Sequence, residues 1–199
     1  MIEVTLVDIT QGAELVISDV AAICYASTKP GKPRLIQLMK KNHLACLRFA
    51  SMAVNITGVS RACTHQLVRH ANFGDMQESQ RHVDASGFGY VVPDSISLDS
   101  ESLKVYRDTM LVIQQAYVFL REKGVPKEDA RFVLPNACAS KIAKVANFQA
   151  WWMFLYGPAG RLQTTAQWEI REVAQQIESI LAEHAPTIFG PSRQVPIPQ

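Results

Sequence analysis

Residues 60–82 read S-R-A-C-T-H-Q-L-V-R-H-A-N-F-G-D-M-Q-E-S-Q-R-H and follow a change in the periodicity of the chain. Just before them, residues 49–56 alternate apolar and polar side chains, which predicts a strand that ends at Gly58. Residues 59–69 then have helical spacing, so we expect a helix with the polar residues of the stretch at its end and in the following loop. A strand followed by a helix is typical of a mixed domain containing both elements.

The remaining segments alternate between strand and helix periodicity. A turn-rich break is expected at residues 28–33, where two prolines and a glycine occur close together. The other expected strands are residues 2–9 and 141–145, and the other expected helices are residues 13–26, 34–42, 97–124, 147–156 and 164–184. We therefore predict a single α+β domain over residues 1–199, in which a small antiparallel sheet is packed by long helices.

Composition indicates a folded protein of ordinary domain size. The chain has 199 residues, 48% of them hydrophobic and 19% charged. Its formal charge of +2 is too small for a general nucleic-acid binder, so any affinity for phosphate must come from a local cluster. We expect a cytoplasmic protein, because the N-terminus lacks a signal-peptide pattern and no apolar run approaches the length of a membrane span.

The four cysteines suggest neither a metal site nor a disulfide framework. They have no C-x-x-C spacing, so we interpret them as small buried thiols in a reducing compartment and expect no metal. Glycine-rich phosphate loops such as G-x-G-x-x-G and G-x-x-x-x-G-K are absent from the sequence. Any dinucleotide must then be held by side chains.

The stretch at residues 60–82 combines three arginines with three histidines and several small polar residues. Guanidinium groups present paired, planar donors that fit phosphate and carbonyl oxygens. A nucleotide is therefore the ligand class that this composition favours.

Three sequence blocks together indicate a family. Arg69, His70 and Ser79 stand where the flavin-dependent thymidylate synthases have the central motif Arg-His-Arg, seven residues, then Ser. Residues 130–135 resemble a second block, A-R-x-V-L-P, and residues 166–171 resemble a third, A-Q-W-E-I-R. The blocks occur in the family's order and at near-family spacing, so the chain is similar to this family over almost its whole length.

The resemblance implies a reaction and a set of ligands. Members transfer a one-carbon unit from methylenetetrahydrofolate to C5 of dUMP, giving dTMP, with hydride from reduced FAD and NADPH as the reductant of the flavin. They are homotetramers whose active sites, where dUMP, FAD and folate meet, form between subunits. By resemblance, the nucleotide-binding positions are Gln66, Gln77, Ser79, Arg81, Arg131 and Arg161, and the retained FAD-binding candidates are His43, Arg69, His70 and Asn147.

Two of these residues are candidates for catalysis. Arg161 against the pyrimidine would stabilise negative charge that develops on the ring. Ser79 has the chemistry of a nucleophile, but no histidine–acid relay can be placed beside it from the sequence. We therefore favour phosphate or substrate binding for Ser79.

The flavin side departs from the family pattern at five positions. Ala71 replaces the second arginine of the motif, and Arg48 stands where glutamate is usual. Gln149 stands where arginine is common, and Met153 and Thr165 occupy positions that are usually polar or histidine. We expect FAD to bind more weakly than in a typical member. Alternatives are hydroxymethylation, the use of UMP, or a dUMP-binding protein without turnover.

Other prominent residues have structural interpretations. His65 is as well suited to a hydrogen-bonded core position as to ligand binding. We interpret Glu169 and Arg171 as part of an ion network on a helix face. Trp151 and Trp152 are expected in the core or at an interface.

Overall fold

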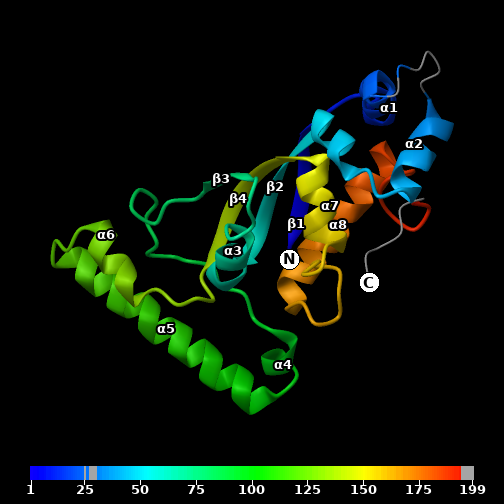
Figure 1. Ribbon diagram of the computed structural model, residues 1–199. Coiled ribbons are helices and arrows are strands. Elements are labelled where there is room, and N and C mark those ends of the chain that lie inside the picture. The colour runs from blue at the N-terminus through cyan, green and yellow to red at the C-terminus, as the bar shows by residue number, and fades with distance from the viewer. Residues whose placement is uncertain (25, 27–30, 194–199) are drawn as a thin grey trace.

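The computed structural model describes residues 1–24, 26 and 31–193 (Figure 1). Its centre is an antiparallel sheet of four strands in the order β1-β2-β4-β3. The strands are β1 (Glu3–Ile9), β2 (Ser51–Ser60), β3 (Gly74–Gln77) and β4 (Ala139–Asn147). The predicted α+β class with a small antiparallel sheet is confirmed.

The two central strands expose one face and bury the other. Along β4, the side chains of Ile142, Lys144 and Ala146 are buried, whereas Lys141 and Val145 are exposed. This period of two is the pattern that the sequence showed at residues 141–145. The predicted strand there is confirmed, and it is longer than expected at both ends.

Strand β2 continues past the glycine at which we expected it to end. The pairing register between β2 and β4 shifts between Ile56 and Val59. Gly58 has φ +72°, and a Cβ there would lie 2.1 Å from the Met1 carbonyl oxygen. The glycine therefore permits an irregularity within the strand. It does not end the strand.

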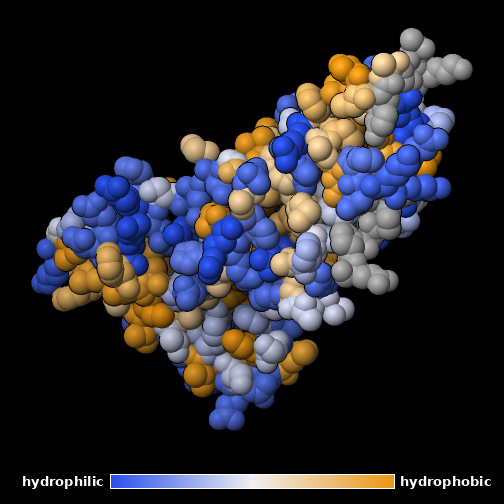
Figure 2. All heavy atoms as spheres, viewed as in Figure 1, coloured by the Kyte–Doolittle hydropathy of each residue, from blue (hydrophilic) through white to orange (hydrophobic). Residues whose placement is uncertain are grey.

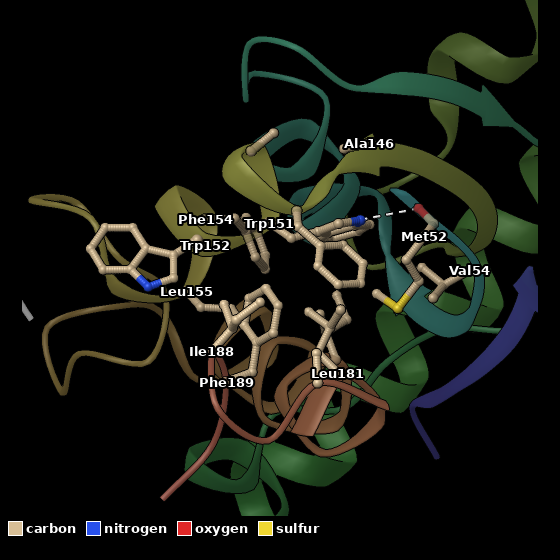
Figure 3. Packing of buried hydrophobic residues seen from close by; sticks show 14 of the residues in the cluster. Met52, Val54, Ala146, Trp151, Trp152, Phe154, Leu155, Leu181, Ile188 and Phe189 are labelled. Carbon is tan, nitrogen blue, oxygen red and sulfur yellow. Dashed lines mark hydrogen bonds between the residues drawn. The ribbon is translucent and has the colours of Figure 1, made fainter. Parts of the chain in front are cut away.

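One group of helices covers the buried face and encloses the main core. The group comprises α1 (Ala13–Cys24), α2 (Lys32–Lys40), the 3-10 helix η1 (Leu44–Phe49), α7 (Phe148–Tyr156) and α8 (Trp168–His184). Figure 3 shows Trp151 and Phe154 of α7 packed among strand residues and residues near the C-terminus of the described chain. Trp151 Nε1 donates to the Met52 carbonyl over 3.1 Å. Trp151 and Trp152 are fully buried, which confirms the core assignment.

The long helix α5 (Ser100–Glu122) forms an arm beside the sheet (Figure 1). The short helices α4 (Asp94–Ser97) and α6 (Lys127–Ala130) and the 3-10 helix η2 (Arg131–Val133) flank it. A second, small core of Ala85, Tyr117 and Ala130 lies beneath the arm. Among the described residues, no helix is both long and apolar enough to span a membrane.

Several local expectations were wrong. Helix α3 (Arg61–Leu67) is shorter than the expected span of residues 59–69, because Ser60 is the N-cap and the chain turns after Leu67. Strand β3 was not expected. His65 is exposed, so it is not a core histidine, and the thiol of Cys24 is exposed. Residues 28–30 of the break expected at residues 28–33 lie outside the described residues.

Glu169 was expected in a surface ion network, and this was also wrong. Its side chain is buried and accepts hydrogen bonds from the Ser60 backbone NH over 2.5 Å and from Ser60 Oγ over 2.6 Å. Ser60 Oγ in turn accepts from the Cys63 NH as the N-cap of α3. Glu169 therefore joins α8 to the start of α3. Arg171, on the same helix, donates to the Thr164 carbonyl.

Candidate functional site

A cleft of about 770 Å³ lies between η1, the loop after α3, and α7. Its volume is in the range of small-molecule and cofactor sites. Six of its lining residues are ones that the sequence placed on the flavin side. The lining consists of Arg48, His70, Ala71, Asn72, Phe73, Asn147, Gln149, Ala150, Met153, Phe154, Pro158 and Ala159.

The loop after α3 adopts its shape because of two backbone constraints. Asn72 has φ +67°, in the left-handed region that asparagine tolerates better than most residues. Gly74 comes two residues later, and a Cβ there would lie 2.9 Å from Val145 Cγ1, so a larger residue would have to displace the Val145 side chain. Between them, the Phe73 ring packs edge-on against Trp151 at 4.7 Å between centroids. These constraints direct the loop along the wall of the cleft.

His70 and Arg161 meet at the cleft. Arg161 Nε donates to His70 Nε2 over 3.0 Å, which requires a neutral imidazole with its proton on Nδ1. Burial, followed by the nearby charges of Arg161 and Lys144, lowers the pKa of His70 to about 4, against a smaller opposing effect of Asp75. His70 therefore stays neutral at physiological pH and fixes one edge of the Arg161 guanidinium.

A buried ion pair supports the His70 loop from beneath. Lys144 is fully buried on β4 and pairs with Asp75 of β3. Its Nζ also donates to the Leu67 carbonyl over 3.1 Å and lies 4.6 Å from the centroid of the Phe73 ring. Burial lowers the pKa of Lys144, while Asp75 opposes that shift. One ammonium group thus ties the end of α3, the loop and the sheet edge together.

The other wall of the cleft offers hydrogen-bond donors. Arg48 Nε donates to Gln149 Oε1 over 2.5 Å. Asn147 is the N-cap of α7, and its Oδ1 accepts from the Ala150 NH over 3.0 Å. Because both amide oxygens are already engaged, each amide can offer a ligand its NH2 group. Among the residues lining the cleft none is acidic, so the wall suits an anion.

A second polar cluster joins Arg81 to Arg131. Arg81 Nε and NH2 lie 3.1 and 3.0 Å from Glu128 Oε2, and Arg131 Nε donates to the Glu128 carbonyl over 3.0 Å. Arg81 and Glu128 are both more than half exposed, so this ion pair is weak and open to exchange. Two of the predicted nucleotide-binding arginines therefore converge on one residue, Glu128, beside α6.

Gln77 is the last residue of β3, which follows the His70 loop and precedes Arg81 in the chain. Its Nε2 donates to Thr64 Oγ1 over 2.7 Å and to Ser140 Oγ over 3.1 Å. With its NH2 group engaged, Gln77 can offer a ligand its carbonyl oxygen. Gln66 is half-buried on α3, the helix that also carries Thr64. Ser79 follows β3, and its Oγ accepts from the Arg81 NH over 3.3 Å.

The structure therefore brings some predicted site residues together and leaves others apart. His70 and Asn147 line the cleft and Arg161 contacts His70, whereas His43 and Arg69 are exposed and are not among the lining residues. The pocket beside α6, lined in part by Arg81 and Glu128, shares no lining residue with the cleft. In Figure 1, α6 lies at the far end of the arm from α7. Within one chain, the Arg81–Arg131 cluster and the cleft are therefore separate, whereas Arg161, another predicted nucleotide-binding residue, contacts His70 of the cleft.

Sequence reasoning missed three supporting residues. Lys144 could have been found, because a lysine shares its strand face with Ile142 and Ala146, which indicates a buried charge that needs a partner. Glu128 stands three residues before Arg131, a spacing that places neighbours on one side of a helical turn. Asp75 had no comparable signal, since β3 itself was not expected.

Comparison with known proteins gives consistent results. A family model described as thymidylate synthase complementing protein matches residues 5–187. A flavin-dependent thymidylate synthase of Geobacter sulfurreducens is 36% identical over 200 residues, covering 94% of this chain and 85% of that protein. One from Clostridium tetani is 32% identical over 221 residues, covering 96% and 88%.

A solved structure has the same fold. It is the crystal structure of a UMP/dUMP methylase, PolB, from Streptomyces cacaoi bound with 5-Br dUMP. The TM-score is 0.81 at 24% identity, with 94% of this chain and 92% of that chain covered. At this identity the likeness supports the arrangement of the sheet and helices.

Proposed function

Because this chain belongs to the thymidylate synthase complementing protein family, we propose that it methylates C5 of dUMP with methylenetetrahydrofolate as carbon donor, giving dTMP. The observation that carries the proposal is the Arg161–His70 pair at the edge of a cleft without acidic lining residues. An arginine whose Nε is fixed in this way keeps its two terminal NH2 groups for a ligand. Such donors stabilise the negative charge that a uracil ring acquires as C5 becomes nucleophilic.

The nucleotide-side residues have separate tasks in this proposal. Arg81 and Arg131, with Ser79, bind the phosphate, which replaces the Glu128 carboxylate as the partner of Arg81. The Gln77 carbonyl accepts the uracil N3–H, since its own NH2 group already donates to Thr64 and Ser140. Gln66 and Arg161 complete the binding set. Ser79 acts as a binding residue in this scheme.

The residues of the cleft fit an anionic, partly aromatic cofactor such as FAD. Arg48, Asn147 and Gln149 contribute donor groups to the lining, and Phe73 and Phe154 contribute aromatic rings. FAD supplies the reducing equivalents of the reaction when it is bound, and NADPH restores them. The protein's part is to hold the ligands in register, exclude water and keep His70 neutral beside Arg161.

We propose that several copies of the chain assemble, as a homotetramer, so that the nucleotide side of one meets the cleft of another. Helix α5 has two apolar faces, because Met110 and Tyr117 are buried against the body while a second stripe is exposed. That stripe consists of Val105, Val112 and Phe119, at intervals of seven residues, and they are 61%, 63% and 57% exposed. Figure 2 shows apolar surface along this arm. Seven-residue spacing suits burial against a helix of another copy.

A cytoplasmic location is part of the same proposal. The cysteines at positions 24, 46, 63 and 138 are all free, as expected in a reducing compartment.

A second candidate function is methylation of UMP. The base contact proposed for Gln77 reads only the uracil ring, which UMP and dUMP share. Nothing in the proposed phosphate contacts of Arg81 and Arg131 distinguishes the two sugars.

Release of tritium from C5-labelled nucleotide tests the proposal. Protein supplied with FAD, NADPH and methylenetetrahydrofolate should release tritium from dUMP, and Arg161→Ala should reduce the rate at least about a hundredfold. Exposed Arg107 of α5 provides a matched control, and Arg107→Ala should leave the rate unchanged. Release from UMP alone would favour the second candidate. Release from neither nucleotide would contradict both.

A further inference from the structure

The fixed positive charge in the lining of the cleft comes from an unexpected element. Among the residues that line the cleft, Arg48 is the one with a permanent charge, since His70 is held neutral by its contact with Arg161. The loop position that normally provides an arginine in this family is Ala71, which lines the same cleft. The positive charge is therefore carried by a residue of η1 and not by a residue of the loop after α3.

Among the described residues, Gln149 sets the orientation of Arg48. Gln149 Oε1 accepts from Arg48 Nε over 2.5 Å, so the guanidinium is attached along its Nε edge to the first turn of α7. This contact leaves the terminal NH2 groups available as a pair of donors, the geometry that suits phosphate oxygens. Gln149 is neutral, so the contact orients the arginine without cancelling its charge.

The surroundings strengthen the case for an anion at this place. The Asn147 side chain caps α7 through Oδ1, which leaves its NH2 group beside the same wall. The first turn of α7, where Gln149 and Ala150 line the cleft, carries the positive end of the helix dipole. A guanidinium, two amide NH2 groups and a helix N-terminus thus act on one side of the cleft, with no carboxylate among its lining residues.

We propose that Arg48, oriented by Gln149, binds the phosphate groups of the cofactor in this cleft and replaces the arginine that is absent at position 71. This inference rests on the proposed function, because that function supplies the identity of the cofactor. It also raises the FAD affinity that we expect, since Arg48 compensates for the charge that is missing at Ala71. Gln149, which stands where arginine is common, becomes the residue that positions the new one.

Calorimetric titration of FAD into the assembled, flavin-free protein tests the inference. Arg48→Gln should weaken FAD binding at least about tenfold, because it removes a charge-assisted contact. Gln149→Ala should weaken it less, because the arginine remains but is no longer oriented. Arg107→Gln on α5 is the matched control for losing an exposed arginine and should leave affinity unchanged. In each variant, dUMP affinity and the thermal midpoint should stay at wild-type values.

A rescue variant distinguishes a charge contact from a local change of structure. In the Arg48→Gln background, Ala71→Arg should recover most of the lost FAD affinity, because it returns the charge from the family's usual side. If wild-type protein binds FAD and Arg48→Gln binds it equally well, the inference is wrong while the proposed function stands. A fall in thermal midpoint that parallels the loss of FAD affinity, without rescue, would assign Arg48 a structural role and also overturn the inference. Wild-type protein that binds no FAD would overturn both.

Discussion

Replacement of Glu169 probes the contact on which the position of helix α3 depends. Its buried carboxylate accepts from both the NH and the Oγ of Ser60, at 2.5 and 2.6 Å. Hydrogen bonds to charged groups contribute about 1.5–3 kcal/mol each, and loss of an N-cap costs about 0.5–2 kcal/mol. The three contacts share Ser60, so their energies are not additive. We expect Glu169→Ala to lower the free energy of unfolding by about 3–4 kcal/mol.

Glu169→Gln separates the loss of charge from the loss of shape. The amide keeps an acceptor for the Ser60 NH and fills the same volume, so the expected loss is about 1–2 kcal/mol. Exposed Glu183 lies on the same helix, and Glu183→Ala should change the free energy of unfolding by less than about 0.5 kcal/mol.

Urea unfolding followed by tryptophan fluorescence measures these differences. Protein concentration must be held constant, because assembly contributes to apparent stability. Glu169→Ala within about 0.5 kcal/mol of wild type would refute the reasoning, since a buried carboxylate that holds two donors cannot be that dispensable. A loss equal to that of Glu183→Ala would refute it equally.

Three further predictions concern the nucleotide side, the cleft and assembly. Arg81→Ala and Arg131→Ala should each weaken dUMP binding at least about tenfold by calorimetry, with Arg107→Ala as control, and unchanged affinity in both would remove the phosphate assignment. The pKa of His70 is about 4 in the folded state and has an ordinary value of 6.5, so between these pH values the unfolded chain binds one more proton than the folded chain. The free energy of unfolding should therefore fall as pH drops from about 6.5 to about 4. His70→Gln should flatten this pH dependence, as measured by urea unfolding at several pH values. Phe119→Asp on the exposed stripe of α5 should shift the mass by light scattering toward the monomer, and an unchanged mass would place the interface elsewhere.

The sequence predicted the parts of the fold that depend on local periodicity. Alternation at residues 2–9 and helical spacing at residues 147–156 correspond to β1 and α7, because both patterns are formed by residues that are close together in the sequence. Strand β3 was missed because its four residues are too short for a period to be visible and pair only with β4. Its position depends on the contact of Gly74 with Val145, which is distant in sequence.

The candidate site was predictable where it depended on a motif and unpredictable where it depended on packing. His70 and Asn147 were identified by resemblance and do line the cleft. The burial of Glu169 was not predictable, since a glutamate in the first turn of a helix usually faces water and its partner Ser60 is 109 residues away. The contact between Arg48 and Gln149 was likewise not predictable from the sequence. The two residues both depart from the family pattern and are 101 residues apart in the chain.

The most direct test of the central claim is identification of the product by mass spectrometry. The purified protein is incubated with dUMP, FAD, NADPH and methylenetetrahydrofolate whose transferable carbon is isotopically labelled. The account predicts dTMP that carries the label in its C5 methyl group, and none when Arg161→Ala replaces the wild-type protein. Unchanged dUMP after incubation with flavin-loaded, folded wild-type protein would contradict the claim, and so would a labelled C5-hydroxymethyl product.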